Sequence, residues 1–234
     1  MIRKKIRSRP FCDLIITTPM KSFIINYDFK YKIISLSTSI NFEKSEKVVF
    51  AKNINDIIII VSNINIYIYQ NYSKLILESK IKINVGGIIP LLAKYNKNIK
   101  GLFVCFNNNN LMRYNIDIKQ RKIIEKKIIL NNISISAFDI CKKFLIFSSW
   151  DIKKLGIYSF SNKRMNYIDL IEDYLNFAFI SSIQIIKINE EYNIFLSLSF
   201  GKLILLKLNK QINTYEKDYE FKNNDFFHKH ILEH

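Results

Sequence analysis

The chain has 234 residues, of which 49% are hydrophobic and 24% are charged, and it carries a formal net charge of +16. This balance excludes a disordered chain, because there are enough apolar side chains to bury a core. No apolar run approaches the about 18 residues of a membrane-spanning helix, so a soluble protein without a membrane partner is expected.

The charge comes mainly from lysine, which supplies 30 of the 36 basic residues and is spread over nearly every turn. Arginine, the side chain that suits bidentate phosphate and base recognition, is scarce. Together with the excess of Ile and Asn, this composition is typical of AT-rich coding. A solvated basic surface is therefore the first interpretation, and a surface for nucleic acid or acidic partners is the second.

Residues 1–20 form the first predicted segment, a basic N-terminal arm. It lacks the apolar core of a secretory signal, because Asp13 and Thr17 to Pro19 interrupt the short run from Leu14 to Ile16. A nuclear localisation or transit segment and a bare basic arm are the alternatives. The candidate nucleic-acid contacts in it are Arg3, Lys4, Lys5, Arg7 and Arg9.

Short apolar runs separated by polar turns then repeat through residues 21–209. Each run ends after about four to eight residues and is rich in β-branched and aromatic side chains, which favours strands over helices. The second run of each repeat begins 45, 42 and 50 residues after the one before it, at Ile57, Leu102, Phe144 and Ile194. Four strands in each period of about 40 to 50 residues are typical of a β-propeller.

The second repeat is the clearest, with runs at Ile88–Ala93, Leu102–Phe106, Leu111–Ile116 and Lys122–Leu130. Asn107 to Asn110 between its second and third runs can supply the positive φ of a hairpin turn, and Gly86-Gly87 also predicts a turn. A partial unit at Ser22–Asn26 and Lys32–Leu36 precedes the first full repeat.

The predicted fold class is therefore all-β: a β-propeller of WD-repeat-like blades with four antiparallel strands, about four to five blades in number, with an incomplete ring as one alternative. The tail at residues 210–234 is either a closing strand or a disordered end.

Catalysis has little support in the sequence. All three histidines lie in the last seven residues, at His228, His230 and His234, outside the strand repeats. The acidic pairs Glu172-Asp173 and Glu190-Glu191 fall in predicted turns, where solvated side chains are the simpler interpretation. Cys12, Cys105 and Cys141 form no CxxC pair, which favours a reducing compartment and no metal site. No enzyme, cofactor or metal is expected.

Trp150, the single tryptophan, is the main candidate for partner binding. It follows Ser148-Ser149 at the end of a predicted strand, near the rim of a blade. A large amphipathic ring there can anchor an interface, and packing between blades is the alternative.

Three segments resemble one family of propellers. They are Ser134 to Ile140, Phe147 to Phe160 with its Trp-containing step, and Phe195 to Leu203 with its glycine-containing turn. In order and spacing, residues 22–209 resemble the central propeller of the large subunit of the UV-damaged-DNA-binding complex, the adaptor of cullin-RING ubiquitin ligases. The cleavage-and-polyadenylation factor and a spliceosomal branch-site complex have large subunits with the same plan. Ser149 stands where the family has a glycine before the tryptophan.

The resemblance implies a non-enzymatic scaffold for protein-protein interaction, acting in nuclear DNA repair as a ubiquitin-ligase adaptor. It implies that Trp150, Asp151, Lys153 and Lys154 contact a cullin-type scaffold or another complex subunit. The alternative is an RNA-processing or splicing subunit of the same family that binds nucleic acid or ribonucleoprotein partners. Either assignment implies localisation in the nucleus.

Overall fold

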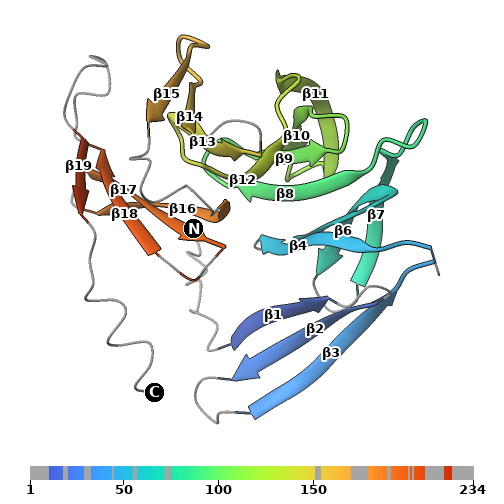
Figure 1. The fold of residues 1–234 in the computed structure, drawn as a ribbon. Helices are drawn as coiled ribbons and strands as arrows, with labels where there is room; N and C mark the ends of the chain where they lie inside the picture. Colours follow the sequence, from blue (N-terminus) through green and yellow to red (C-terminus); the bar gives the residue numbers. More distant parts are fainter. Residues whose placement is uncertain are drawn as a thin grey trace, which may run out of the picture. The chain divides into compact units, whose positions relative to one another are not determined.

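The computed structural model describes residues 11–17, 21–28, 33–43, 45–54, 57–71, 75–150, 154–169, 179–188, 191–199, 201, 203–208 and 219–222. Every regular element among these residues is a β-strand (Figure 1). No helix in this part of the chain is long and apolar enough to cross a membrane. The chain divides into two compact units, Met1–Ile129 and Leu130–His234, and each is described by itself.

The first unit contains three antiparallel sheets whose consecutive strands are hydrogen-bonded neighbours. Their strands are β1 (Phe11–Thr17), β2 (Lys21–Asp28) and β3 (Ile33–Asn41); β4 (Val48–Ile54), β5 (Ile57–Ser62), β6 (Asn65–Asn71) and β7 (Leu75–Lys82); and β8 (Pro90–Asn96), β9 (Gly101–Phe106), β10 (Leu111–Asp117) and β11 (Lys122–Leu130). β4, the first strand of its sheet, contacts both β1 and β8, so the sheets stack in chain order.

The second unit contains two sheets of the same plan. Their strands are β12 (Ile135–Ile140), β13 (Phe144–Ser149), β14 (Lys154–Ser159) and β15 (Met165–Asp169); and β16 (Ile180–Ile188), β17 (Glu191–Leu198), β18 (Leu203–Leu208) and β19 (Tyr219–Lys222). The first strands of the two sheets, β12 and β16, pack against each other. The prediction of an all-β, propeller-type fold with four-stranded blades is confirmed.

In the β4–β7, β8–β11 and β12–β15 sheets the second strand is the most buried. All six residues of β5 and of β9 are buried, and so are five of the six in β13. A strand that is buried on both faces needs apolar side chains at every position, which explains the continuous apolar runs of the sequence. The outer strands β7 and β11 are mostly exposed and carry lysines, which discourage pairing at a sheet edge.

Each unit has its own core. In the first unit, side chains such as Ile59 and Ile68 from the β4–β7 sheet pack with Leu102 and Val104 from the β8–β11 sheet. In the second unit, Phe144, Ile146 and Leu155 pack with Ile194 and other side chains of the β16–β19 sheet. The fold thus depends on stacking between sheets.

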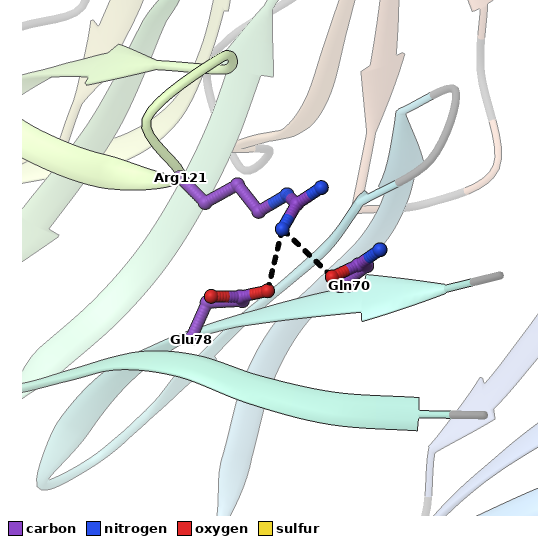
Figure 2. Close-up of polar contacts among 3 residues, drawn as sticks. All are labelled: Gln70, Glu78 and Arg121. Carbon is purple, nitrogen blue, oxygen red and sulfur yellow. Dashed lines mark hydrogen bonds and ion pairs between the residues drawn. The ribbon is translucent and has the colours of Figure 1, made fainter.

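An ion pair also joins two sheets of the first unit. Arg121, in the turn between β10 and β11, donates to Glu78 Oε1 at 2.6 Å and to Gln70 Oε1 at 2.7 Å (Figure 2). Glu78 lies on β7 and Gln70 on β6. The contact fixes one end of the β8–β11 sheet against its neighbour.

Both predicted turns are present. Gly86 and Gly87 have φ values of 63° and 81°, and Asn109 has a φ of 62° in the β9–β10 turn. These left-handed conformations suit Gly and Asn, as the sequence indicates.

Two strands lie in the segments expected to be terminal. β1 occupies part of the expected basic arm, and β19 occupies part of the expected tail, where it pairs with β18 as a closing strand would. No strand is predicted in the arm from the sequence alone. The division into an arm at 1–20, a propeller at 21–209 and a tail at 210–234 stays a prediction.

Candidate functional site

One junction recurs in all four four-stranded sheets. The residue that follows the second strand donates its N–H to the carbonyl of the residue that precedes the first strand. The four bonds are Asn63 to Lys47 at 2.8 Å, Asn107 to Ile89 at 3.0 Å, Trp150 to Ser134 at 2.9 Å and Ser199 to Phe179 at 2.9 Å. The sequence repeat thus places one residue of each repeat, two Asn, one Trp and one Ser, at equivalent structural positions.

A bulge marks the same place in each sheet. The pairing between first and second strands shifts register just after the first strand begins, between Val48 and Phe50, Pro90 and Leu92, Ile135 and Ala137, and Ile180 and Ser182. Bulges of this kind redirect side chains at the edge of a sheet. Because they recur, the four junctions can be compared residue by residue.

Asparagine at this position completes the junction with its side chain. Asn63 Oδ1 accepts the N–H of Lys47 at 2.7 Å, and Asn107 Oδ1 accepts the N–H of Ile89 at 3.0 Å. Asn63 Nδ2 donates to the carbonyl of Ser45 at 3.1 Å, and Asn107 Nδ2 donates to the carbonyl of Gly87 at 3.2 Å. In the last sheet Ser199 Oγ accepts the N–H of Phe179 at 3.3 Å. A short polar side chain is therefore the structural choice at this position.

Trp150 departs from that choice. Its indole can donate a hydrogen bond but cannot accept the backbone N–H that the other three side chains cap. Its ring packs instead on Phe179, with centroids 4.6 Å apart and the planes tilted by 50°. Trp150 is 57% exposed and Phe179 is 45% exposed. We call these two residues the aromatic pair.

The aromatic pair joins the end of β13 to the start of β16 within the second unit. The ring of Trp150 thus touches the next sheet, as the packing interpretation expected, and still presents more than half of its surface to solvent. Exposed aromatic rings are enriched at the centres of protein interfaces, where they bury a large area at low entropic cost.

The other predicted partner-binding residues are only partly described. Lys154 is exposed at the start of β14. Asp151 and Lys153 lie outside the described residues, as do Arg3, Lys4, Lys5, Arg7 and Arg9 and the three histidines. Their assigned roles stay predictions.

Phe179 is not among the predicted site residues, although the sequence holds a signal for it. It immediately precedes the first strand of the fourth repeat, the position that Ser134 holds one repeat earlier. Aligning the repeats on their strand starts marks Phe179 as a junction residue, the counterpart of Ser134, although its contact with Trp150 depends on how the sheets stack.

Glu46 is the strongest candidate for acid-base chemistry, since it is a carboxylate only 1% exposed. Its Oε1 accepts from Ser62 Oγ, from Asn65 Nδ2 at 3.0 Å and from Tyr67 OH at 2.7 Å, and Oε2 lies 2.8 Å from the same hydroxyl. Burial raises the pKa of Glu46, but these hydrogen bonds and the charge of Lys80 together lower it below 4.5. Both oxygens are therefore occupied by the protein itself, and Glu46 fixes the loop before β4.

No metal centre is found in the part of the chain that the structure describes, where no cluster of three or more His, Cys, Asp or Glu could hold an ion. Cys105 and Cys141 are both buried cysteines. Burial raises the pKa of Cys141, so its thiolate is disfavoured.

Comparison with known proteins gives structural matches only. No protein-family model and no curated protein matches the sequence. The fold is similar to BBS1N in its complex with ARL6DN, with a TM-score of 0.61, 10% identity and 86% of this chain covered. It is also similar to Raptor from Chaetomium thermophilum, with a TM-score of 0.60, 11% identity and 92% covered. A third match is the dihydro-heme d1 dehydrogenase NirN, with a TM-score of 0.57, 8% identity and 86% of this chain covered.

These matches support the propeller fold and nothing finer. This chain spans 63% of the BBS1N chain, 20% of Raptor and 45% of NirN. The damaged-DNA-binding subunit has no support from sequence or family comparison. NirN is an enzyme on a propeller, so the fold alone does not decide between a scaffold and an enzyme.

Proposed function

We propose that this protein is a non-enzymatic scaffold that binds a protein partner through the aromatic pair of the second unit. The observation that carries the proposal is the exposed Trp150 at a position where two other sheets have a hydrogen-bonding asparagine and one has a serine. Since tryptophan forgoes the cap and leaves more than half of its surface in water, the fold itself gains little from it. BBS1N, which is similar in fold, was crystallised with a protein partner, and this supports the same class of role.

The resemblance of residues 22–209 to the damaged-DNA-binding subunit suggests a finer assignment. In it the protein acts in the nucleus as an adaptor of a ubiquitin ligase, and the partner is a cullin-type scaffold. Trp150 and Lys154 on the described surface, with Asp151 and Lys153 beside them in sequence, form the contact.

Affinity purification from cells with mass spectrometry tests the proposal. The wild-type chain should recover a defined set of proteins, and Trp150→Ala and Phe179→Ala should each reduce their yield at least about tenfold, as hot-spot aromatics do. Tyr167→Ala is the matched control, because Tyr167 is an aromatic residue of the same unit that is 44% exposed and lies on β15. Equal recovery by all four proteins would contradict the proposal, and recovery without a cullin would contradict only the finer assignment.

Nucleic-acid binding is the second candidate, favoured by the net charge of +16. Binding to phosphates should weaken steeply and linearly in log affinity against log salt, whereas docking through apolar anchors should respond weakly. Titration with single-stranded RNA and with duplex DNA at several salt concentrations separates the two candidates.

A further inference from the structure

An apolar groove lies within the first unit, between its two four-stranded sheets. Its volume is about 210 Å³. Ile81 near the end of β7 and Ile83 just after this strand line one side, and Phe106 and Met112 from the β9–β10 hairpin line the other. The loop after β7 contributes Val85, which is 68% exposed.

The two sheets are fixed to each other at the end opposite the groove. Arg121, which pairs with Glu78, lies in the turn after β10 (Figure 2). The groove is lined instead by Met112 near the start of β10. On β7 the groove likewise lies at the C-terminal end, beyond Glu78. Because the two sheets are held together by this ion pair, the groove is preformed before a ligand binds. Preorganisation of this kind lowers the entropic cost of binding.

The size of the groove selects a class of ligand. Sites for drug-sized molecules and cofactors occupy about 300–1,000 Å³, which is more than this groove offers. A cavity of about 150 Å³ takes a benzene ring. A volume of about 210 Å³ therefore suits one large apolar side chain presented by a peptide.

The charge around the groove indicates which residues should flank that side chain in the peptide. Lys82 and Lys126 are exposed and line it, and none of the residues that line it is acidic. Burial raises the pKa of Tyr114, another lining residue, to about 12, so its phenol stays neutral. The field at the groove mouth is therefore positive, which attracts acidic segments and speeds their association.

We propose that this groove binds a short peptide segment that inserts one Phe or Leu side chain between flanking Asp and Glu residues. A second copy of the chain fits less well, because two chains of charge +16 repel each other. This site lies in the first unit, apart in sequence from the aromatic pair, and so goes beyond the proposed function.

The test uses the whole chain and a fluorescein-labelled peptide in which one Phe-Leu pair lies between two clusters of Asp and Glu. Fluorescence anisotropy measures its affinity. Val85→Asp places a carboxylate at the groove mouth and should weaken binding at least about tenfold. Ile124→Asp is the matched control, because Ile124 is an aliphatic residue of β11 that is 60% exposed and does not line the groove.

Charge reversal gives a second, independent comparison. Lys82→Glu with Lys126→Glu should weaken binding at least about tenfold, while Lys122→Glu with Lys127→Glu, an equal change in net charge on exposed lysines of β11, should change it less than about threefold. Peptides with Ser in place of Phe-Leu, or Lys in place of the acids, should lose binding.

Three outcomes would overturn the proposal: no binding of the acidic peptide at millimolar concentration, equal losses in the groove and control variants, or equal binding of the Ser-substituted peptide. Circular dichroism confirms that each variant is folded. Trp150→Ala should bind the peptide as the wild type does, so this groove and the proposed function can fail separately.

Discussion

Replacing Trp150 with Asn should separate a role in binding from a role in folding. The substitution installs the side chain that caps the same junction at Asn63 and Asn107. If Trp150 binds a partner, the Asn variant should fold with nearly wild-type stability but bind that partner more weakly.

The expected free energies follow from the contacts. Asn107→Ala removes two side-chain hydrogen bonds at an exposed junction and should lower the free energy of unfolding by about 1 kcal/mol. Trp150→Ala removes the ring contact with Phe179 and should lower it by about 1 kcal/mol as well. Trp150→Asn loses that contact but gains a cap, so its stability should lie within about 0.5 kcal/mol of the wild type.

Urea unfolding followed by far-ultraviolet circular dichroism measures these differences, because the two Trp150 variants lack the only tryptophan and its fluorescence. Affinity purification of the same variants measures binding. The reasoning is refuted if Trp150→Asn loses more than about 2 kcal/mol, since the indole would then belong to the packing of the fold. It is equally refuted if Trp150→Asn retains full recovery of partners.

Other predictions concern the fold around these sites. Glu46→Gln should lower the free energy of unfolding by about 2 kcal/mol at neutral pH. Because the folded pKa of Glu46 is lowered, the advantage of the wild type should be complete above pH 4.5 and be lost as the pH falls through the folded pKa, which urea titrations at several pH values would show. Gly156→Ala would place a Cβ against the ring of buried Phe147 and should cost about 2–3 kcal/mol in thermal unfolding, whereas a cost near zero would mean that the ring moves freely. Arg121→Ala should cost about 1 kcal/mol, and the loss should shrink in high salt, because Arg121 pairs with partly exposed Glu78.

The strands were predictable where local sequence decides them. The predicted runs Leu102–Phe106 and Lys122–Leu130 match β9 and β11 to within one residue, because continuous apolar or alternating patterns end at clear turn residues. β1 was missed because only Leu14 to Ile16 in it form an apolar run, and its pairing with β2 outweighs that weak local signal. β19 consists of four residues with little pattern, and pairing with β18 forms it.

The site was half predictable for a similar reason. The position of Trp150 at a blade rim can be predicted from the local sequence, because it follows a predicted strand. Its contact with Phe179 depends on how two sheets of the second unit stack. The groove of the first unit depends on stacking too, since Ile81 and Met112 come from different sheets. Contacts between sheets have no signature in a single strand.

Repetition nevertheless supplies information that single strands lack. When one structural position recurs in several sheets, the kind of side chain that most copies share indicates what the fold requires there. A copy with a different side chain indicates a requirement other than folding. Asn63, Asn107 and Ser199 share a polar acceptor that caps a backbone N–H, and Trp150 gives up that acceptor. In a fold whose sheets are so alike, the departure is a physical argument for binding that needs no homologue, and the exchange of Trp150 for Asn tests it directly.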